Sequence, residues 1–323
     1  MTASLVYMGW RVYAEGGANV LYTNEGRLAG KLLRLRKKHK YKVSTKEVYD
    51  FMKDELVPYL GNTWIIRFEL VRVPRGFYSA LGNTKEKLDL SEEYGLLVEN
   101  ARFDQIEDIR PSRKTDLTYG SLEIRKLQHG TTSVFLEFKP KWLVQSPNAP
   151  ASAKCCRTCA HRAMTNRPKG FCPLDLGSGD PYRVRRAVKA LLGNAVNNNE
   201  IPLEDIVTTY FLETNLLQSL RRLQALDTRG ILNYHESKDL DKNFFLAMSS
   251  RDCTLFLEIF DQNVGGNTPV SVNGTYYWVK AKLADLDLKN PKKRSQWAAV
   301  EANLQPWYNN VQFSSVSTGC QMV

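Results

Sequence analysis

Residues 10–23 (WRVYAEGGANVLYT) restrict most strongly what this chain can fold into. β-branched and aromatic residues stand on both sides of residues 15–19 (EGGAN), a pattern typical of two strands joined by a glycine-containing tip. Residues 31–42 (KLLRLRKKHKYK) interleave leucines with seven Lys/Arg, as a strand with one solvated face does. An antiparallel sheet is therefore predicted for the first part of the chain.

A helix is predicted to follow over Ser44–Val57, with Ser44 and Thr45 as candidate N-caps. Residues 96–100 (LLVEN) have the composition of a buried strand, and we place a hinge there. The chain is thus predicted to be α+β, with a small β-rich N-lobe at 1–100 and a larger mixed α/β C-lobe at 101–323. This order suits a nucleotide-dependent phosphotransferase.

Further elements are predicted in the second lobe. Strands are expected over residues 133–142, around Asp252 (residues 244–260) and over residues 276–288, and helices over residues 181–192 and 203–226.

Charge narrows the class of partner. The 323 residues carry 45 Lys+Arg against 34 Asp+Glu, a net charge of +11, and 43% are hydrophobic, which excludes wholesale disorder. The partner is expected to be acidic: nucleic acid, an anionic membrane face or a multiply phosphorylated small molecule. No apolar run approaches the ~20 residues of a membrane span. The first residues lack a secretory pattern, so a nuclear and/or cytoplasmic protein is expected.

Three groups of residues could carry phosphate chemistry. Glycines at the tip of a hairpin let backbone N–H groups approach phosphate oxygens, although most such pairs are simple turns. Lys139 and Lys141 are two apart on an extended segment and so share a face, which fits either an anion site or a solvated strand edge. Asp252 and the pair Asp285 and Asp287 are candidates for orienting a hydroxyl and holding Mg²⁺, or alternatively for turns and caps.

Four of the six cysteines fall in a Cys-rich segment at about 154–180, whereas Cys253 and Cys320 stand apart. Cys156, Cys159, His161 and Cys172 offer three thiolates and an imidazole, a suitable set for tetrahedral Zn²⁺. Cys155 could replace Cys156, and His161 can join only if a loop rather than a helix follows Cys159. Reduced cysteines packed as small apolar groups are the alternative.

Taken together, these segments resemble the inositol-pentakisphosphate 2-kinase family. The resemblance runs through EGGANVL (15–21), GKLLRLRK (30–37), LLVEN (96–100), LEFKPKW (136–142), CRTCAH (156–161), CPLDLGSG (172–179), SRDCT (250–254) and DLDLK (285–289). It implies a two-lobed inositol-phosphate kinase, distantly protein-kinase-like. The implied reaction is ATP-dependent phosphorylation of the 2-hydroxyl of inositol 1,3,4,5,6-pentakisphosphate, which gives inositol hexakisphosphate (phytic acid).

The resemblance also implies roles for individual residues. Asp252 would be catalytic together with Lys139, and Asp285 would hold Mg²⁺. The nucleotide contacts would be Glu15, Gly16, Gly17, Ala18, Asn19, Arg34 and the hinge residue Glu99. Contacts to the inositol phosphates would be Lys139, Lys141, Arg157, Asn197, Asn198, Lys289 and Lys293, where Asn198 could slide to Asn199.

The expected cofactors are ATP, Mg²⁺ and one structural Zn²⁺. The chain is expected to act as a monomer on a small molecule, with no membrane and no nucleic acid as partner. A noncatalytic inositol-phosphate-binding or nucleic-acid-binding basic protein is the alternative, and it leaves Asp252 and Asp285 unexplained. Two positions depart from family members: Thr165 where some have lysine, and Trp297 in a tyrosine-rich stretch.

Overall fold

The computed structural model describes residues 9–24, 26, 28, 30–38, 43–102, 113–127, 130–198, 201–309 and 320, except the side chains at positions 75, 83, 113 and 196–198. The chain divides into two compact units. The first comprises residues 1–105 and 287–290, and the second comprises residues 106–286 and 291–323. The segment 287–290, which the sequence analysis placed with the C-lobe, therefore groups with the first unit.

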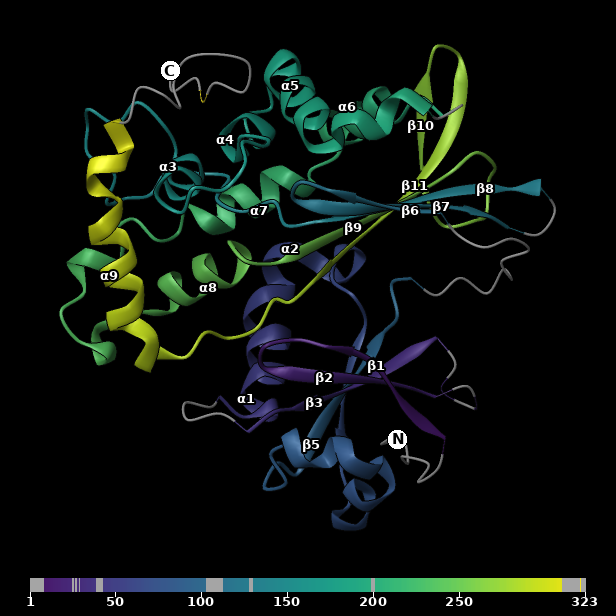
Figure 1. Cartoon of the computed structure of the whole chain (residues 1–323), viewed down its shortest axis with the longest axis vertical. Coiled ribbons are helices and arrows are strands. Elements are labelled where there is room, and N and C mark those ends of the chain that lie inside the picture. Colours follow the sequence, from purple (N-terminus) through teal and green to yellow (C-terminus); the bar gives the residue numbers. More distant parts are fainter. Residues whose placement is uncertain are drawn as a thin grey trace. The chain divides into compact units, whose positions relative to one another are not determined.

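The first unit is built on a five-stranded antiparallel sheet in the order β1-β2-β3-β5-β4. Its strands are β1 (Trp10–Glu15), β2 (Asn19–Asn24), β3 (Lys31–Arg36), β4 (Phe68–Arg72) and β5 (Tyr94–Glu99) (Figure 1). The predicted hairpin is confirmed, because β1 pairs with β2 from Glu15↔Val20 to Trp10↔Asn24. The basic strand is confirmed over β3.

Helical segments pack against this sheet. They are α1 (Thr45–Asp50), the π-helical η1 (Phe51–Leu56) and α2 (Val57–Trp64), and the helical backbone is interrupted within α2 at Gly61 (φ 72°, ψ 164°). The predicted start is confirmed, since the Ser44 hydroxyl accepts from Glu47 N–H while the Glu47 carboxylate accepts from Ser44 N–H, a capping box. The 3₁₀ segment η2 (Arg75–Lys87) contributes Phe77 and Leu81 to a core shared with Tyr22 of β2.

The second unit contains a six-stranded antiparallel sheet in the order β10-β11-β9-β8-β7-β6. Its strands are β6 (Arg113–Leu117), β7 (Gly120–Lys126), β8 (Thr132–Phe138), β9 (Thr254–Phe260), β10 (Thr268–Val272) and β11 (Thr275–Ala284). In β8 and β9 nearly every residue is buried, so these central strands form the core of the unit.

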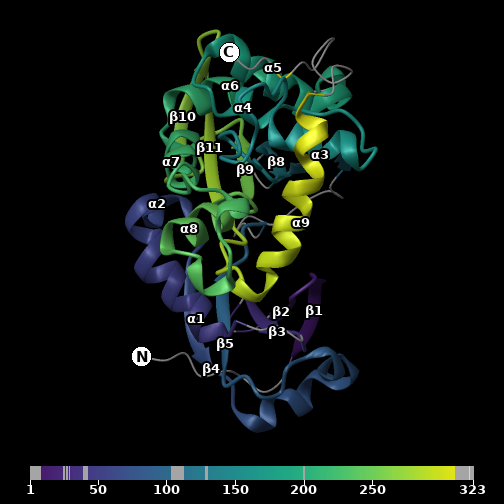
Figure 2. The same cartoon turned by 90° about the vertical axis from the view of Figure 1, so that its left-hand side faces the viewer.

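The second unit also contains helices. They are α3 (Arg157–Met164), α4 (Pro173–Leu176), α5 (Pro181–Leu192), α6 (Leu203–Glu213), α7 (Leu216–Gln224), α8 (Lys242–Ser250) and α9 (Arg294–Leu304), with the short η4 (Gly193–Asn198) and η7 (Pro291–Lys293) between them. Helix α6 packs against β10 (Figure 1), and α9 lies beside α3 (Figure 2). None of the helices in the described ranges is long and apolar enough to cross a bilayer.

Two predictions about elements in this unit are wrong. The helix predicted over residues 203–226 is broken after Glu213, because Thr214 takes an extended backbone (φ −108°, ψ 155°), and α7 starts after its N-cap Asn215. The residues before Asp252, predicted as strand, form α8, which Asp241 caps by accepting from Phe244 N–H at 2.8 Å. The helix predicted at Pro181–Leu192 is confirmed as α5.

Candidate active site

Three strand ends meet at one edge of the six-stranded sheet. Phe138 ends β8 and pairs with Leu255 of β9, while Ala284 ends β11 and pairs with Thr254 of β9. Since antiparallel neighbours run in opposite directions, the residues that follow β8 and β11 lie beside those that precede β9. Residues predicted for catalysis come together here, namely Lys139, Lys141, Asp252 and Asp285.

The two lysines share the two carboxylates. Lys139 Nζ donates to the backbone oxygen of Asp252 at 2.8 Å, and it lies 3.5 Å from Asp252 Oδ1 and 3.7 Å from Asp285 Oδ2. Lys141 Nζ lies 3.3 Å from the same Asp252 Oδ1. The carboxylate side chains are 51% and 57% exposed, so the cluster lies at an open surface where a substrate can reach it.

Lys141 and Asp285 share an unusual backbone conformation. Both residues have a left-handed backbone, with φ of 62° and 59° respectively. Asp tolerates this conformation, whereas in Lys it is uncommon and costs on the order of 1 kcal/mol, a strain that recurs at functional sites. Burial lowers the pKa of the Lys141 ammonium, the charge of Asp252 opposes that shift, and the charge of Lys139 adds to it.

Asp285 has the chemistry of a Mg²⁺ ligand. The Thr254 hydroxyl donates to Asp285 Oδ2 at 2.7 Å and so orients the carboxylate. Mg²⁺ prefers carboxylate oxygens and keeps several of its waters, which an exposed group at a strand end allows. The residues present therefore fit the predicted metal role.

In the first unit, the glycine turn connects β1 to β2. Gly16 N–H donates to the backbone oxygen of Asn19 at 2.9 Å, and Lys37 N–H donates to that of Ala18 at 2.9 Å. Neither Gly16 nor Gly17 has a positive φ, and a Cβ on Gly17 would have no heavy atom within 4 Å. Contacts within the described chain therefore give no reason for glycine at position 17, and its missing side chain leaves room for an external group.

Glu15 secures one side of this turn. Its carboxylate lies 2.6 Å from Lys37 Nζ and 2.8 Å from Lys87 Nζ, and Lys37 Nζ also donates to the backbone oxygen of Gly16 at 3.0 Å. Hydrogen bonds to Lys37 and then Lys87 lower the pKa of Glu15 to about 2. The predicted nucleotide residue Glu15 thus already binds two lysines in the structure.

Arg34 holds the other side of the turn. Its guanidinium makes a two-pronged ion pair with Asp287, in which Nη1 lies 2.7 Å from Oδ1. With its amide oxygen turned toward Arg34, Asn19 accepts from Arg34 Nε at 3.1 Å. Burial tends to raise the pKa of Asp287, but the charge and hydrogen bonds of Arg34, together with the charges of Arg36 and Lys289, lower the pKa below its usual range.

The arginines of β3 line a small pocket. Asn19, Arg34 and Arg36 share this space with Thr45, Val48 and Leu96, and its volume of about 10 Å³ leaves room for about one water molecule. The sequence analysis missed Arg36, although its position two residues after Arg34 on a strand puts both side chains on one face. Two guanidinium groups in a pocket beside the glycine turn favour an anionic ligand.

The predicted hinge residue Glu99 ends β5. Its carboxylate accepts from Arg67 N–H at 3.2 Å and lies 3.5 Å from Arg67 Nε. The backbone N–H of Glu99 donates to the Arg67 oxygen at 2.8 Å. These hydrogen bonds do not bear on contact with an adenine, so the nucleotide role of Glu99 stays a prediction.

Arg157, a predicted inositol-phosphate contact, already has partners in the structure. Its Nε lies 2.7 Å from Oε2 of the buried Glu301, and its guanidinium carbon lies 4.2 Å from the Trp142 ring centroid. An anion would therefore compete with Glu301 for this guanidinium. Its role as a substrate contact stays a prediction.

The other predicted inositol-phosphate contacts are spread over both units. Lys289 lies in the first unit, where its charge helps to lower the pKa of Asp287, and Lys293 ends η7 in the second. The backbone of Asn197 and Asn198 ends η4, but their side chains and all of Asn199 lie outside the described residues.

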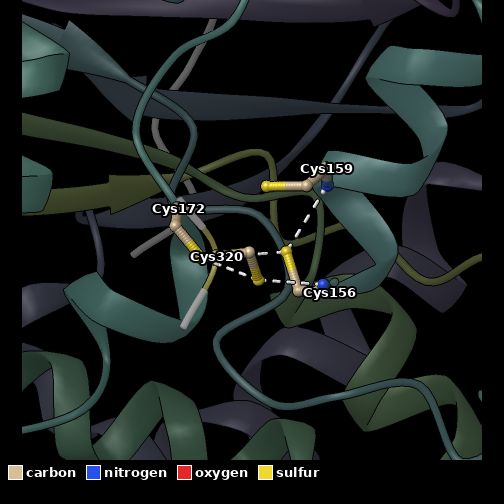
Figure 3. A group of neighbouring side chains, drawn as sticks. All are labelled: Cys156, Cys159, Cys172 and Cys320. Carbon is tan, nitrogen blue, oxygen red and sulfur yellow. Dashed lines mark hydrogen bonds between the residues drawn. The ribbon is translucent and has the colours of Figure 1, made fainter. Parts of the chain in front are cut away.

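Four cysteine sulfurs form a compact buried group in the second unit. The sulfurs of Cys156, Cys159, Cys172 and Cys320 lie within 4.8 Å of one another, and their side chains point toward one another (Figure 3). The Sγ of Cys172 lies 3.8 Å from that of Cys156 and 3.5 Å from that of Cys320. Four thiolates at about 2.3 Å from one Zn²⁺ would be about 3.8 Å apart, so the donor set fits a tetrahedral zinc ion.

In the structure the fourth member of this group of potential metal ligands is Cys320 and not the predicted His161. The chain after Cys159 is helical, because α3 runs from Arg157 to Met164. Residues two apart on a helix point to nearly opposite sides, so Cys159 and His161 cannot face the same ion. The alternative Cys155 is also outside the group, since its sulfur donates to the backbone oxygens of Trp307 and Tyr308 at 3.4 Å. Cys320 was not predicted as a member of this group, because sequence spacing does not show which distant residues come together in the fold.

Carboxylates set among lysines at one edge of a sheet are the groups that phosphoryl transfer needs, so the site suits a phosphotransferase. The sequence profile described as "Inositol-pentakisphosphate 2-kinase" matches residues 13–303. A Yarrowia lipolytica protein named inositol-pentakisphosphate 2-kinase is 31% identical over 93% of this chain and 92% of its own length. Proteins with the same name from Debaryomyces hansenii and Danio rerio are 28% and 26% identical, over 93% and 68% of this chain and over 92% and 47% of their own lengths. The chain belongs to the inositol-pentakisphosphate 2-kinase family.

Proposed function

We propose that this chain transfers the γ-phosphoryl group of ATP to the 2-hydroxyl of inositol 1,3,4,5,6-pentakisphosphate, which yields ADP and inositol hexakisphosphate. The observation that carries the proposal is the meeting of Asp252 and Asp285 with Lys139 and Lys141 at one sheet edge. Phosphoryl transfer needs a carboxylate that accepts the hydroxyl proton and cations that offset charge on the transferred group.

In this mechanism Asp252 orients the 2-hydroxyl and accepts its proton as the oxygen attacks phosphorus. Lys139 and Lys141, which already contact Asp252, neutralise the transferred group and the neighbouring phosphates. Asp285, oriented by Thr254, would hold Mg²⁺, and the ion would supply positive charge to the nucleotide phosphates. The bond from phosphorus to the bridging oxygen of ADP breaks while the bond to the inositol oxygen forms.

The nucleotide side of the proposal rests on the first unit. The turn at Gly17, which Gly16 N–H closes by donating to the backbone oxygen of Asn19, would approach the ATP phosphates with its backbone, and Arg34, held by Asp287, would lie beside them. The open space at Gly17 and the pocket lined by Arg34 and Arg36 support this assignment.

We also propose one structural Zn²⁺ held by Cys156, Cys159, Cys172 and Cys320. Their burial and sulfur separations support it, and none of the four forms a disulfide. Because a metal with four protein ligands has no open position, this ion would stabilise the fold without taking part in phosphoryl transfer.

An assay with ATP, Mg²⁺ and a panel of inositol phosphates tests the proposed reaction. We expect inositol 1,3,4,5,6-pentakisphosphate to gain one phosphate, and we expect isomers whose 2-hydroxyl is already phosphorylated to give no product at that position. Binding of the pentakisphosphate without ADP release would overturn the proposal in favour of a noncatalytic binding protein.

A further inference from the structure

Gln224 is a fully buried polar residue beneath the candidate active site. It is the last residue of α7, where Leu220 and Leu223 are also buried. A buried amide is costly unless its donors and acceptor are hydrogen-bonded, so the partners of Gln224 reveal what it holds.

The Gln224 amide bonds two segments that are far apart in the sequence. Its oxygen accepts from Leu143 N–H at 2.7 Å, and its nitrogen donates to the backbone oxygen of Lys141 at 2.9 Å. The same nitrogen donates to the backbone oxygen of Ser250 at 3.2 Å. One side chain thus joins the segment after β8 to the segment that leads into Asp252.

Arg251 reinforces this junction from the other segment. Its Nη2 donates to the backbone oxygen of Gln224 at 3.1 Å, and its Nη1 lies 2.7 Å from Asp227 Oδ2. Its guanidinium carbon lies 3.8 Å from the ring centroid of Trp142, the neighbour of Lys141. Both segments are therefore fixed to the end of α7.

The bonds of Gln224 flank the strained residue of the site. Lys141 has a left-handed backbone, which persists only where the surroundings hold it. Gln224 binds the carbonyl of Lys141 and the N–H two residues later, while its third bond fixes the carbonyl two residues before Asp252. Relaxation of this turn would move Lys141 Nζ away from Asp252 Oδ1, from which it is now 3.3 Å distant.

We infer that Gln224 is a positioning residue that sets the geometry between Lys141 and Asp252. The inference rests on the proposed function for its effect on turnover, but its geometric part stands without it. The role demands one acceptor and two donors at this side-chain length, which among the standard residues only glutamine supplies. Asparagine is too short, and glutamate would place a carboxylate oxygen against two carbonyl oxygens.

The test compares Gln224→Met, Gln224→Glu and Gln224→Asn with the control Asp241→Ala. Methionine has nearly the volume of glutamine but makes none of the three bonds, glutamate keeps the acceptor alone, and asparagine keeps the amide at a shorter reach. Asp241 caps the N-terminus of α8, and Asp252 follows the C-terminus of that helix. Loss of the cap therefore weakens α8 without removing any hydrogen bond of Gln224. Kinetics are measured well below the melting temperature of each variant, so that all are folded.

We expect the Gln224 variants to lose kcat by about tenfold to a hundredfold, because small displacements of reacting groups have effects of that size. Their KM for ATP should stay unchanged, and Asp241→Ala should show a lower melting temperature with wild-type kcat. Folded Gln224 variants with wild-type kcat would overturn the inference, as would an equal loss of kcat in the control.

Crystal structures of the wild type and of the Gln224 variants provide a second readout. We expect a longer separation of Lys141 Nζ and Asp252 Oδ1 in each variant, and an unchanged separation would also overturn the inference. If the wild type transfers no phosphate, the proposed function fails while this separation still decides the role of Gln224. If Gln224→Met does not fold, the glutamate and asparagine variants give the same comparison.

Discussion

Lys139 and Lys141 reach the same carboxylate by different routes. The sequence analysis put both on one face of an extended segment, but β8 ends at Phe138 and Lys141 is left-handed. Both ammonium groups nevertheless lie within 3.5 Å of Asp252 Oδ1. Strand alternation correctly predicted that the two lysines face the same way. It could not predict the left-handed backbone of Lys141, because no pattern in the sequence indicates that conformation for a lysine.

Asp252→Asn tests the proton acceptor at the scale of one residue. Asparagine keeps the shape of the side chain but removes its charge and basicity. We expect kcat to fall by between about 10² and 10⁴. Binding of inositol pentakisphosphate should be retained, since the nearby lysines remain. Steady-state kinetics and calorimetric titration measure the two effects, and unchanged turnover would remove Asp252 from the mechanism.

Glu15 predicts a pH dependence. Its pKa is lowered to about 2 in the folded chain, so its ion pairs stabilise the fold above the unfolded value of 4.5 and are lost as pH falls from there toward 2. The stabilisation is small because the group is exposed. We expect Glu15→Gln to have a lower melting temperature than wild type at pH 7, with a difference that shrinks steadily below pH 4.5. A constant difference across that range would contradict the ion-pair account.

Elements were predicted best where local signals agree. The capping residues Ser44 and Asp180 mark the observed helix starts, and residues 15–19 mark the β1–β2 turn. The wrong predictions concern segments whose secondary structure depends on tertiary contacts. Residues 244–250 are apolar enough for strand or helix, and the Asp241 cap, which favours helix, was overlooked. The residues of β6 and β7 were given no element, because their composition is mixed.

The glycine turn gives a prediction for one element. Gly17→Ala should leave the melting temperature unchanged, because Gly17 has no positive φ and a Cβ there meets open space. If ATP phosphates occupy that space, the KM for ATP should rise by about tenfold, equivalent to about 1.4 kcal/mol. Differential scanning fluorimetry and kinetics provide the two measurements. An unchanged KM would place the nucleotide elsewhere.

The group of four cysteines gives a second prediction at this scale. Cys320→Ala should lower the zinc content well below one ion per chain and lower the melting temperature, because a structural zinc contributes its binding energy to folding. The matched change His161→Ala should keep the zinc, since α3 turns His161 away from Cys159. Elemental analysis of purified protein decides between them, and loss of zinc in the histidine variant alone would restore the original ligand set.

At the scale of the whole molecule, the net charge of +11 suits a substrate with many phosphates. Arg183 and Arg186 both pair with the single buried Asp175, so this group keeps a surplus of positive charge within the fold. Composition alone left nucleic acid and membrane faces open as partners. The carboxylates at the sheet edge and the family match narrow the choice to phosphoryl transfer.

Ionic strength tests this electrostatic argument. Salt screens charges beyond about 10 Å at 0.1 M. We therefore expect the KM for inositol pentakisphosphate to rise steadily with added NaCl while kcat changes little. Titration with a neutral osmolyte of equal osmolality is the control. A KM independent of salt would show that long-range attraction contributes nothing to binding.

The return of residues 287–290 to the first unit has a consequence for biosynthesis. Arg34 and its partner Asp287 are 253 positions apart. The ion pair between them can therefore form only after most of the chain has been synthesised. At about 5–20 residues per second, that delay lasts more than ten seconds. The unit translated first is thus completed nearly last, and in a nascent chain stalled before Asp287 the side chain of Arg34 on β3 would lack its carboxylate partner.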